Sequence, residues 1–479
     1  MNQTITQTAG ARIAPGPRRT PLFGNVLEAW RDPLTLFLNS TRAHGDVVKF
    51  RFGPYDYFLL NDAEAVKHLL VDHHKNYTKS RNYKGLKLIL GEGLITSEGE
   101  HWRRQRKLAQ PAFHKERLAS FVACFANDTA SMLDRWARDR LTELDVHEEM
   151  MRLTFRIVGR TLLSVDVDGA AREIGEALSV VLHHANEYAE SLVPIPIWVP
   201  LPENFRFKRA IKVLDDLVYG IIAERRRSGG SGAQHDDLLA LLMEAVDEQT
   251  RETMTDLQLR DEVMTLVLAG HETTANALSW TWALLSRHPD VERKLRAEVD
   301  AVLQGRAPTA DDLPNLRYTA MVVQEAMRLY PPVWIFERQA IEADTILGFS
   351  IPKGSIVGVS PYALHRNARY WENPEGFDPE RFSTARSSSR PRHAYLPFAV
   401  GPRQCIGNAF ALMEAQVIVA MMVQRHRLEL VPGEKVEPDP KVTLRPLHGV
   451  RVAVKSPATE PSVRPPTREP GAGCPIHHA

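Results

Sequence analysis

One stretch decides how the chain is interpreted: Phe398-Ala-Val-Gly401-Pro402-Arg403-Gln404-Cys405-Ile406-Gly407. Its cysteine is framed by turn-forming residues and followed by a small apolar segment, residues 408–415, that is typical of the start of a helix. Unpaired backbone N–H groups and the positive end of the dipole stabilise a thiolate at a helix N-terminus. Gly401 and Gly407 let the backbone turn tightly and approach a flat, bulky group. We therefore expect Cys405 to be functional, and not a buried structural cysteine in a turn.

The overall composition is that of an ordinary globular protein. The chain has 479 residues, a net charge of +1 and 43% hydrophobic residues. Balanced charge argues against a binder of nucleic acid or acidic polymers. Three cysteines, Cys124, Cys405 and Cys474, cannot form a disulfide framework, which fits a reducing compartment. The first ten residues carry no secretory signal, and no apolar run reaches the length of a membrane span. We expect a cytoplasmic protein.

The sequence predicts one domain, residues 15–455, between two disordered ends, 1–14 and 456–479. The first end is polar, and the second is rich in proline, serine and charge. Neither a repeat nor a shift in composition divides the rest. The tail also carries Cys474-Pro-Ile-His477-His478, a group that can bind haem or a soft metal but that lacks a scaffold.

Most of the chain has helical periodicity, so the predicted fold is mainly α with a minor β-sheet region. A hairpin is predicted from Val47–Phe52 and Tyr57–Leu60, and a second strand pair within Ile346–Val359 around Pro352-Lys353-Gly354. Helices are predicted over Asp62–Asp72, Lys115–Trp136, Val146–Leu163, Arg172–Tyr188, Lys208–Arg226, Asp237–Asp247, Val291–Leu303, Leu316–Tyr330 and Ala411–His426.

One predicted helix is exceptionally long and apolar on nearly all sides. Thr255 and Gln258 form a capping box at its start, and the pattern continues to Arg287, where His288-Pro289 stops it. At about 1.5 Å per residue it spans about 45 Å, enough to cross a large domain. Its apolar surface predicts that it is buried.

A polar turn interrupts this helix at Ala269-Gly270-His271-Glu272-Thr273-Thr274. A buried carboxylate is costly unless it is paired or functional. Threonine hydroxyls can bond back to main-chain carbonyls and open a local bulge. We expect a bulged, polar notch that faces a cofactor; the alternative is a helix bent around a core water. The adjacent acid and alcohol favour the notch.

Two further groups of residues suggest buried contacts with charged partners. Glu325 and Arg328 share a helix face, and Arg381 follows in a proline-framed turn, so a glutamate shared by two arginines predicts a structural clamp. Trp102 and Arg106, at i and i+4, together suit a carboxylate. Arg338 and Arg403 are further candidates for carboxylate contacts, whereas Arg103, Arg104 and Lys107 are interpreted as an ordinary basic helix face.

Taken together, these motifs resemble the cytochrome P450 family of haem-thiolate monooxygenases. They occur in the family's order across roughly residues 20–455: Trp-x-x-x-Arg at 102–106, Ala-Gly-x-Glu-Thr-Thr at 269–274, Glu-x-x-Arg at 325–328, Pro-Glu-Arg-Phe at 379–382, and the cysteine motif at 398–407. The cysteine motif is highly specific, whereas Glu-x-x-Arg alone is not.

The resemblance implies a cytochrome P450 fold, haem b as cofactor, and a role for each motif. By that resemblance Cys405 is the proximal thiolate of the iron. The propionate partners are Trp102, Arg106, Arg338 and Arg403. Glu325, Arg328 and Arg381 are the structural triad. Glu272 and Thr273 are the acid–alcohol pair that delivers protons to iron-bound dioxygen, while Thr274 assists the helix kink.

The expected reaction is insertion of one oxygen atom from O₂ into a C–H or C=C bond of a hydrophobic substrate. A fatty acid, a terpenoid and a polyketide-like molecule remain open. The predicted substrate wall comprises Leu268, Ala269, Val333, Trp334 and Leu447, with the apolar loops at 83–96 and 192–207 as further candidates. No membrane span and no nucleic-acid partner are expected, and a monomer is the default.

Electrons are expected from a separate partner, because the sequence shows no flavin or iron–sulfur unit. A ferredoxin with its reductase, or a flavodoxin-type reductase, is expected to dock on a basic belt. The alternative is that the residues of this belt form only a solvated surface. The belt comprises Arg103, Arg104, Lys107, Lys115 and Arg117.

Three alternative functions remain. A peroxygenase or rearranging enzyme of the same fold tends to alter the acid–alcohol pair, which is intact here. A haem-binding sensor or carrier needs no such pair. A hydrolase with a cysteine nucleophile lacks a convincing histidine and asparagine set.

Overall fold

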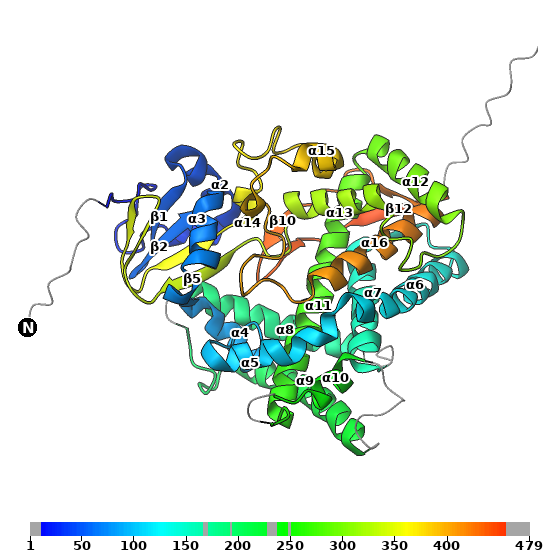
Figure 1. Ribbon diagram of the computed structural model, residues 1–479, viewed down its shortest axis with the longest axis horizontal. Coiled ribbons are helices and arrows are strands. Elements are labelled where there is room, and N and C mark those ends of the chain that lie inside the picture. The colour runs from blue at the N-terminus through cyan, green and yellow to red at the C-terminus, as the bar shows by residue number, and fades with distance from the viewer. Residues whose placement is uncertain (1–10, 166–170, 192–193, 228–236, 248–250, 457–479) are drawn as a thin grey trace, which may run out of the picture.

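Helices make up most of the protein; β1, β2 and β5 lie on one side of it, whereas β12 lies on the other side beside α12 and α16 (Figure 1). The computed structural model describes residues 11–165, 171–191, 194–227, 237–247 and 251–456. The helices are α1 (Val26–Arg31), α2 (Pro33–His44), α3 (Ala63–Lys67), α4 (Lys84–Leu90), α5 (Gly99–Ala109), α6 (Lys115–Arg138), α7 (Val146–Leu163), α8 (Ala171–Glu190), α9 (Pro202–Arg227), α10 (Leu238–Glu244), α11 (Asp256–Leu285), α12 (Pro289–Leu303), α13 (Arg317–Leu329), α14 (Pro361–Leu364), α15 (Thr384–Ser387) and α16 (Asn408–Arg425). Two short helical turns matter below: the π-helix η1 (His68–Asp72) and the 3₁₀ helix η5 (Pro379–Phe382).

The strands form one sheet of five and three smaller sheets. They are β1 (Val47–Phe52), β2 (Tyr55–Leu60), β3 (Tyr77–Lys79), β4 (Glu143–Asp145), β5 (Phe336–Ala340), β6 (Asp344–Ile346), β7 (Phe349–Ile351), β8 (Ile356–Val359), β9 (Arg427–Leu430), β10 (Pro438–Pro440), β11 (Leu444–Pro446) and β12 (Arg451–Lys455). The large sheet has the order β1-β2-β8-β5-β3, and the predicted hairpin forms its β1–β2 edge.

The second predicted strand pair is wrong in its partners. β7 pairs with β6 across the turn at Leu347-Gly348, where both residues have positive φ. β8, beyond Gly354, joins the large sheet between β2 and β5. The turn at Gly354, with φ of 80°, therefore moves the chain from one sheet to another.

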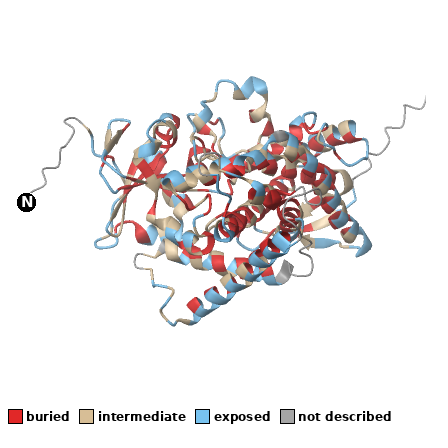
Figure 2. Ribbon diagram, turned by 60° about the horizontal axis from the view of Figure 1, so that its bottom comes forward, coloured by how far each residue is buried: buried red, intermediate tan, exposed pale blue. Residues whose placement is uncertain are grey.

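The long helix α11 crosses the centre of the molecule (Figure 1). Its capping box is formed: the Thr255 hydroxyl accepts from the Gln258 N–H, and the Gln258 side chain accepts from the Thr255 N–H. Figure 2 shows that buried residues concentrate on the central helices while the outer helices expose one face. The predicted bulge is absent, because α11 stays α-helical through residues 269–274. The hydroxyl of Thr273 bonds back to the Ala269 carbonyl at 2.5 Å without opening the helix.

Two large apolar clusters pack on α11. One joins its C-terminal half to α6, α12, α13 and α16, and the other joins its N-terminal half to α4, α7, α8 and α9. The boundary between them falls at the polar turn. The helix thus carries the polar turn at residues 269–274 between two apolar clusters.

The structure describes a part of each of the two predicted tails. Residues of the segment assigned to the N-terminal tail already pack, since the Arg12 N–H donates to Gly348 O at 2.8 Å and Ala14 is buried. Nearly all of the C-terminal tail, with Cys474, His477 and His478, lies outside the described residues. Within the described ranges, no helix combines the length and apolar character that a membrane crossing needs.

Candidate active site

A cavity of about 590 Å³ lies between the Cys405 loop and the middle of α11. Its apolar lining comes from α4, α11, α13 and the loop before β5. The residues are Leu86, Leu90, Leu94, Ile95, Leu266, Leu268, Val323, Met327, Trp334 and Phe398. Such a concave, mainly apolar chamber with a few polar groups is typical of a small-molecule site.

The Cys405 loop is shaped by close backbone packing. Gly401 has φ of 76°, and a Cβ built there would lie 2.1 Å from the carbonyl oxygen of Leu70 in η1. The Cys405 N–H donates to Phe398 O at 3.0 Å, which closes the loop before α16 begins. Only a residue without a side chain fits at position 401.

The thiol of Cys405 is exposed to the cavity. Desolvation raises its pKa, whereas the Gly407 N–H and the charge of Arg106 lower it. A metal cation facing the sulfur would lower this pKa further, because coordination deprotonates a thiol.

The four predicted carboxylate partners all line the cavity. The Arg403 guanidinium lies 3.8 Å above the Trp102 ring and donates to Ser97 O at 2.9 Å. Arg106 donates to Gln404 O at 2.9 Å, and Arg338 is buried in β5. The structure thus gathers cations from α5, β5 and the Cys405 loop at one end of the cavity.

Lys79, which the sequence analysis missed, joins this group. β3 pairs with β5 so that Lys79 lies opposite Arg338, and its ammonium is 4.5 Å from the Tyr83 ring centre. Burial lowers the pKa of Lys79, and the nearby charges of Arg338 and Arg403 lower it further. Glu98, paired with Arg403, balances only part of this charge. The group therefore suits a ligand with two carboxylates, as haem has.

The predicted acid–alcohol pair lines the opposite side of the cavity. Glu272 is buried, and its Oε1 accepts a hydrogen bond from the Thr443 hydroxyl at 2.6 Å. Its Oε2 has no hydrogen-bond partner among the described residues. Burial raises the pKa of Glu272, so this carboxyl is a potential proton donor at the cavity wall. Neighbouring His271 packs edge-on against Phe155 and does not line the cavity.

A second buried carboxyl lies beneath the site, and the sequence analysis missed it also. Glu414 of α16 is fully buried, and burial raises its pKa well above the usual value, an effect that the Thr274 hydroxyl only partly offsets. Its position between Phe410 and Ala415, which line the cavity, follows from the helical spacing of α16. The sequence signal that could have identified Glu414 is a single carboxyl group within the apolar run of α16.

The predicted clamp forms away from the cavity. Arg328 donates to both oxygens of Glu325, at 2.7 and 2.8 Å, and Arg381 of η5 donates to Oε1 at 3.2 Å. Arg328 also donates to the carbonyls of His365, Pro374 and Gly376. The clamp joins α13 to the long segment that precedes the Cys405 loop.

The structure brings together four of the five residues of the predicted substrate wall. Leu268, Ala269, Val333 and Trp334 line the cavity, but Leu447 is 45% exposed and lies outside the lining. The β10–β11 hairpin instead presents its turn, Pro440–Thr443, to the cavity. In the first predicted loop, residues of 83–95 line the cavity, whereas the described part of 192–207 contributes none; Ser191, directly after α8, does line it.

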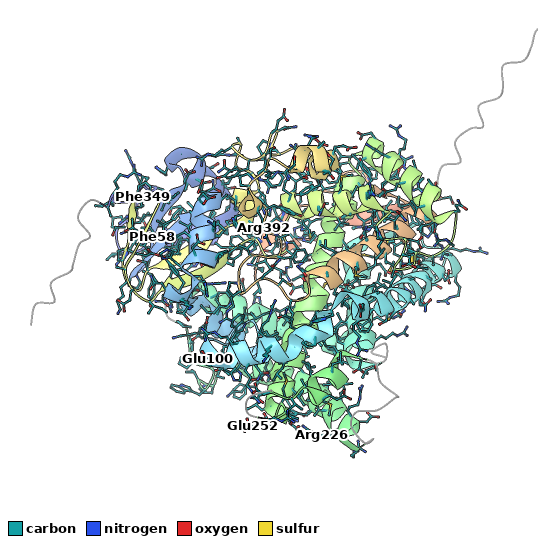
Figure 3. All side chains as sticks on the ribbon, viewed as in Figure 1. Phe58, Glu100, Arg226, Glu252, Phe349 and Arg392 are labelled. Atoms are coloured by element: carbon teal, nitrogen blue, oxygen red, sulfur yellow. The ribbon has the colours of Figure 1, made fainter. Side chains whose placement is uncertain are left out.

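Fewer residues of the basic belt are available to contact a docked partner than predicted. Arg104 lies 3.3 Å from Asp247 and 3.6 Å from Glu252, which is labelled in Figure 3, and only 20% of the Arg104 side chain is exposed. Arg103 pairs with Glu100 of its own helix. Arg104 is therefore an internal contact to the segment after α10, because its guanidinium turns inward.

Comparisons with known proteins agree with this geometry. The family described as "Cytochrome P450" matches residues 14–450. Cyclooctatin synthase of Streptomyces melanosporofaciens is 40% identical over 90% of this chain and 93% of its own length. Pentalenene oxygenase of Streptomyces avermitilis is 34% identical over 89% of this chain and 93% of its own length. The crystal structure of the cytochrome P450DA heme domain superposes with a TM-score of 0.84 at 26% identity, covering 93% of this chain and 98% of that one.

The match spans nearly the whole described chain and includes both sides of the cavity. The gathered cations and the cysteine beside them fit haem, the cofactor of that family. The chain therefore belongs to the cytochrome P450 family and is a haem-dependent monooxygenase that acts on a hydrophobic substrate.

Proposed function

We propose that this enzyme inserts one oxygen atom from O₂ into a C–H or C=C bond of a cyclic terpenoid. The observation that carries the proposal is the apolar wall that α4, α11 and α13 give to the cavity, whose volume of about 590 Å³ has to hold the haem as well as the substrate. Three relatives support this substrate class by their names: cyclooctatin synthase and pentalenene oxygenase, reported above, and cyclooctat-9-en-7-ol 5-monooxygenase, which is 39% identical. A compact hydrocarbon gains affinity from such walls through burial of its apolar surface.

In this proposal the two ends of the cavity have different tasks. Cys405 holds the haem iron, and Trp102, Lys79 and the arginines at 106, 338 and 403 hold the propionates. When bound, haem supplies the chemistry that activates O₂, and a thiolate ligand favours cleavage of the O–O bond. The polypeptide positions this cofactor through the Cys405 loop and excludes water through its apolar wall.

Glu272 and Thr273 supply protons from the α11 side. Glu272 Oε2 is buried and unpartnered among the described residues, and its raised pKa keeps a proton available at the wall. The Thr273 hydroxyl is anchored by the Ala269 carbonyl, so its oxygen can accept and pass on a proton. An intact acid–alcohol pair supports a monooxygenase over a peroxygenase or a sensor.

Electrons come from a separate ferredoxin or flavodoxin-type protein in this proposal. Arg104 takes no part in its docking, because its guanidinium already contacts Asp247. Neutralising Arg104 should therefore leave the salt dependence of reduction unchanged, measured by stopped-flow absorbance.

The first experiment tests the cofactor ligand. The purified, haem-loaded protein should give a red-shifted ferrous–CO Soret band, and Cys405→Ser should abolish it. Cys124→Ser is the matched control, since Cys124 is a half-buried cysteine that contacts Asp128 on α6. A Cys405→Ser protein that keeps the red-shifted band would overturn the assigned ligand.

The second experiment tests the substrate class. Cyclic terpene hydrocarbons and alcohols should shift the haem spin state, while linear fatty acids of equal carbon number and small polar aromatics should not. Ala269→Phe, which fills the cavity, should weaken the terpene response at least tenfold, and Leu447→Phe, at an exposed position outside the lining, should not. A spin-state shift with fatty acids alone would mean that the substrate is a fatty acid and not a terpenoid.

A further inference from the structure

Three metal-ligating side chains meet outside the cavity lining. They are His68 and His73, at the two ends of the π-helix η1, and Asp344 at the start of β6. One donor atom from each lies within 4.8 Å of the others. In the described part of the chain this is the only such group.

The π-helix brings the two histidines together. The His73 N–H donates to His68 O at 2.8 Å, an i to i+5 bond, so the residues lie one above the other on the same face. Their rings stack with centres 3.9 Å apart and planes 12° apart. In a regular α-helix, residues five apart would diverge by more than a quarter turn. The π-helical turn therefore places two potential metal ligands on the same face.

Asp344 is oriented toward the histidines from another element. Its Oδ2 lies 2.8 Å from His68 Nε2 and accepts from the Tyr77 hydroxyl at 2.7 Å, and its Oδ1 accepts from the Thr345 N–H at 2.7 Å. A carboxylate held in place by outer hydrogen-bond donors is the usual environment of a metal ligand.

We propose that His68, His73 and Asp344 form a binding site for a divalent transition-metal ion such as Zn²⁺, with water as the fourth ligand. Two imidazoles and one carboxylate suit Zn²⁺, Ni²⁺ or Cu²⁺, whereas Ca²⁺ and Mg²⁺ prefer oxygen ligands throughout. The site is open to solvent, because His73 is exposed and Phe349, on the strand paired with β6, lies at the outer edge in Figure 3. Because an imidazole nitrogen donates in the plane of its ring, one ion can be bound by both histidines only when the exposed His73 ring turns out of its stack on His68.

The ion would join β6 to the segment beneath the Cys405 loop. η1 contacts that loop directly, since the Leu70 carbonyl occupies the space that a side chain at Gly401 would need. Leu69 and Leu70 also pack in one cluster with Leu396 and Val400. Binding therefore stabilises the support of the loop and raises the thermal midpoint by mass action.

The test is a Zn²⁺ titration of the full, haem-loaded chain by calorimetry. The parent protein carries Cys474→Ser, His477→Ala and His478→Ala, because the tail offers its own ligands. We expect one ion per chain with micromolar affinity. His73→Ala and Asp344→Asn should each weaken binding at least tenfold and abolish the Zn²⁺-dependent rise in thermal midpoint. Haem absorbance confirms that each variant is folded.

The matched control is His183→Ala. His183 is an exposed imidazole 3.3 Å from a carboxylate, that of Glu187, and it has no place in a three-ligand group among the described residues. With Cu²⁺ as probe, electron paramagnetic resonance should show two imidazole nitrogens in the parent and fewer in His73→Ala. Absence of binding to the parent, equal loss in His183→Ala, or binding that His73→Ala and Asp344→Asn leave unchanged would overturn the proposal. None of these outcomes depends on the proposed substrate.

Discussion

The α13–η5 clamp and the middle of α11 both bury a glutamate, and they treat it in opposite ways. Glu325 is 0% exposed, and its carboxylate meets two arginines and the Asp378 N–H. Glu272 is 7% exposed, and its carboxyl meets one hydroxyl. Burial of an unpaired charge is costly, so the first residue is suited to hold structure and the second to hold a proton. The two glutamates therefore show a structural use and a chemical use of a buried carboxyl group within one protein.

Removing the clamp carboxylate should have the largest effect. Glu325→Ala leaves Arg328 and Arg381 buried without a counter-charge, at an expected cost of about 3–5 kcal/mol in the free energy of unfolding. Urea unfolding and the haem content of the purified protein measure it. Glu380→Ala, in the same η5 turn but partly exposed and paired with Lys294, should cost less than about 1 kcal/mol. A loss below 1 kcal/mol for Glu325→Ala would sink the idea of a clamp.

The next effect depends on pH and concerns Glu262, another buried glutamate of α11. Leu94 N–H donates to one of its oxygens at 3.2 Å, the other is unpartnered among the described residues, and burial raises its pKa to about 8. From about pH 4.5 to 8 the folded state keeps a proton that the unfolded state releases, so stability falls as pH rises. Glu262→Gln removes this titration.

The advantage of Glu262→Gln over the parent should therefore grow with pH. The upper limit is about 1.4 kcal/mol per pH unit, or about 3 kcal/mol in practice across the window. Urea unfolding at several pH values between 5 and 8 measures it. Glu100→Gln, at a side chain that is 84% exposed, should show a flat difference. An equally flat difference for Glu262→Gln would contradict the raised pKa.

Glu272→Gln should change the reaction and leave stability intact. Loss of a positioned proton donor costs about a hundredfold in rate, equal to about 2.7 kcal/mol in the barrier. Product formed per NADPH, with the best ligand from the terpene panel and a supplied redox partner, measures it. The unfolding free energy should not fall, because the variant buries an amide in place of an unpaired carboxyl. A drop in stability with normal turnover would assign Glu272 to structure, like Glu325.

The sequence predicted the elements whose signals are local. The clamp pair and the Cys405 loop depend on spacing within a few residues, and the capping box of α11 on a gap of three. Lys79 could not be predicted, because only the register of β3 against β5 brings it opposite Arg338. Leu447 lies outside the cavity lining for a related reason: the short β10–β11 hairpin directs its turn, and not its end, to the cavity.

The predicted bulge is absent because back-bonding by hydroxyl groups and packing on both sides of α11 act on the same turn of the helix. Hydroxyl groups can bond back to the main chain without breaking it, as Thr273 and Ser279 both do on α11. Packing on both sides of the helix favours continuous α geometry over the small gain from a bulge. Sequence reasoning located the polar turn correctly but not its backbone.

The smallest effect should come from Thr443→Val, which tests how Glu272 is held. The Thr443 hydroxyl donates to Glu272 Oε1 at 2.6 Å and accepts from the Asn276 amide at 3.0 Å. Valine leaves both groups buried without this partner, at a cost of about 1–2 kcal/mol, and Thr443→Ser should recover most of it. Because the Thr443 bond lowers the pKa of Glu272, the variant should also hold the proton more tightly. If urea unfolding shows no change, the hairpin does not fix the carboxyl, and Glu272 differs from Glu325 in mobility as well as in charge.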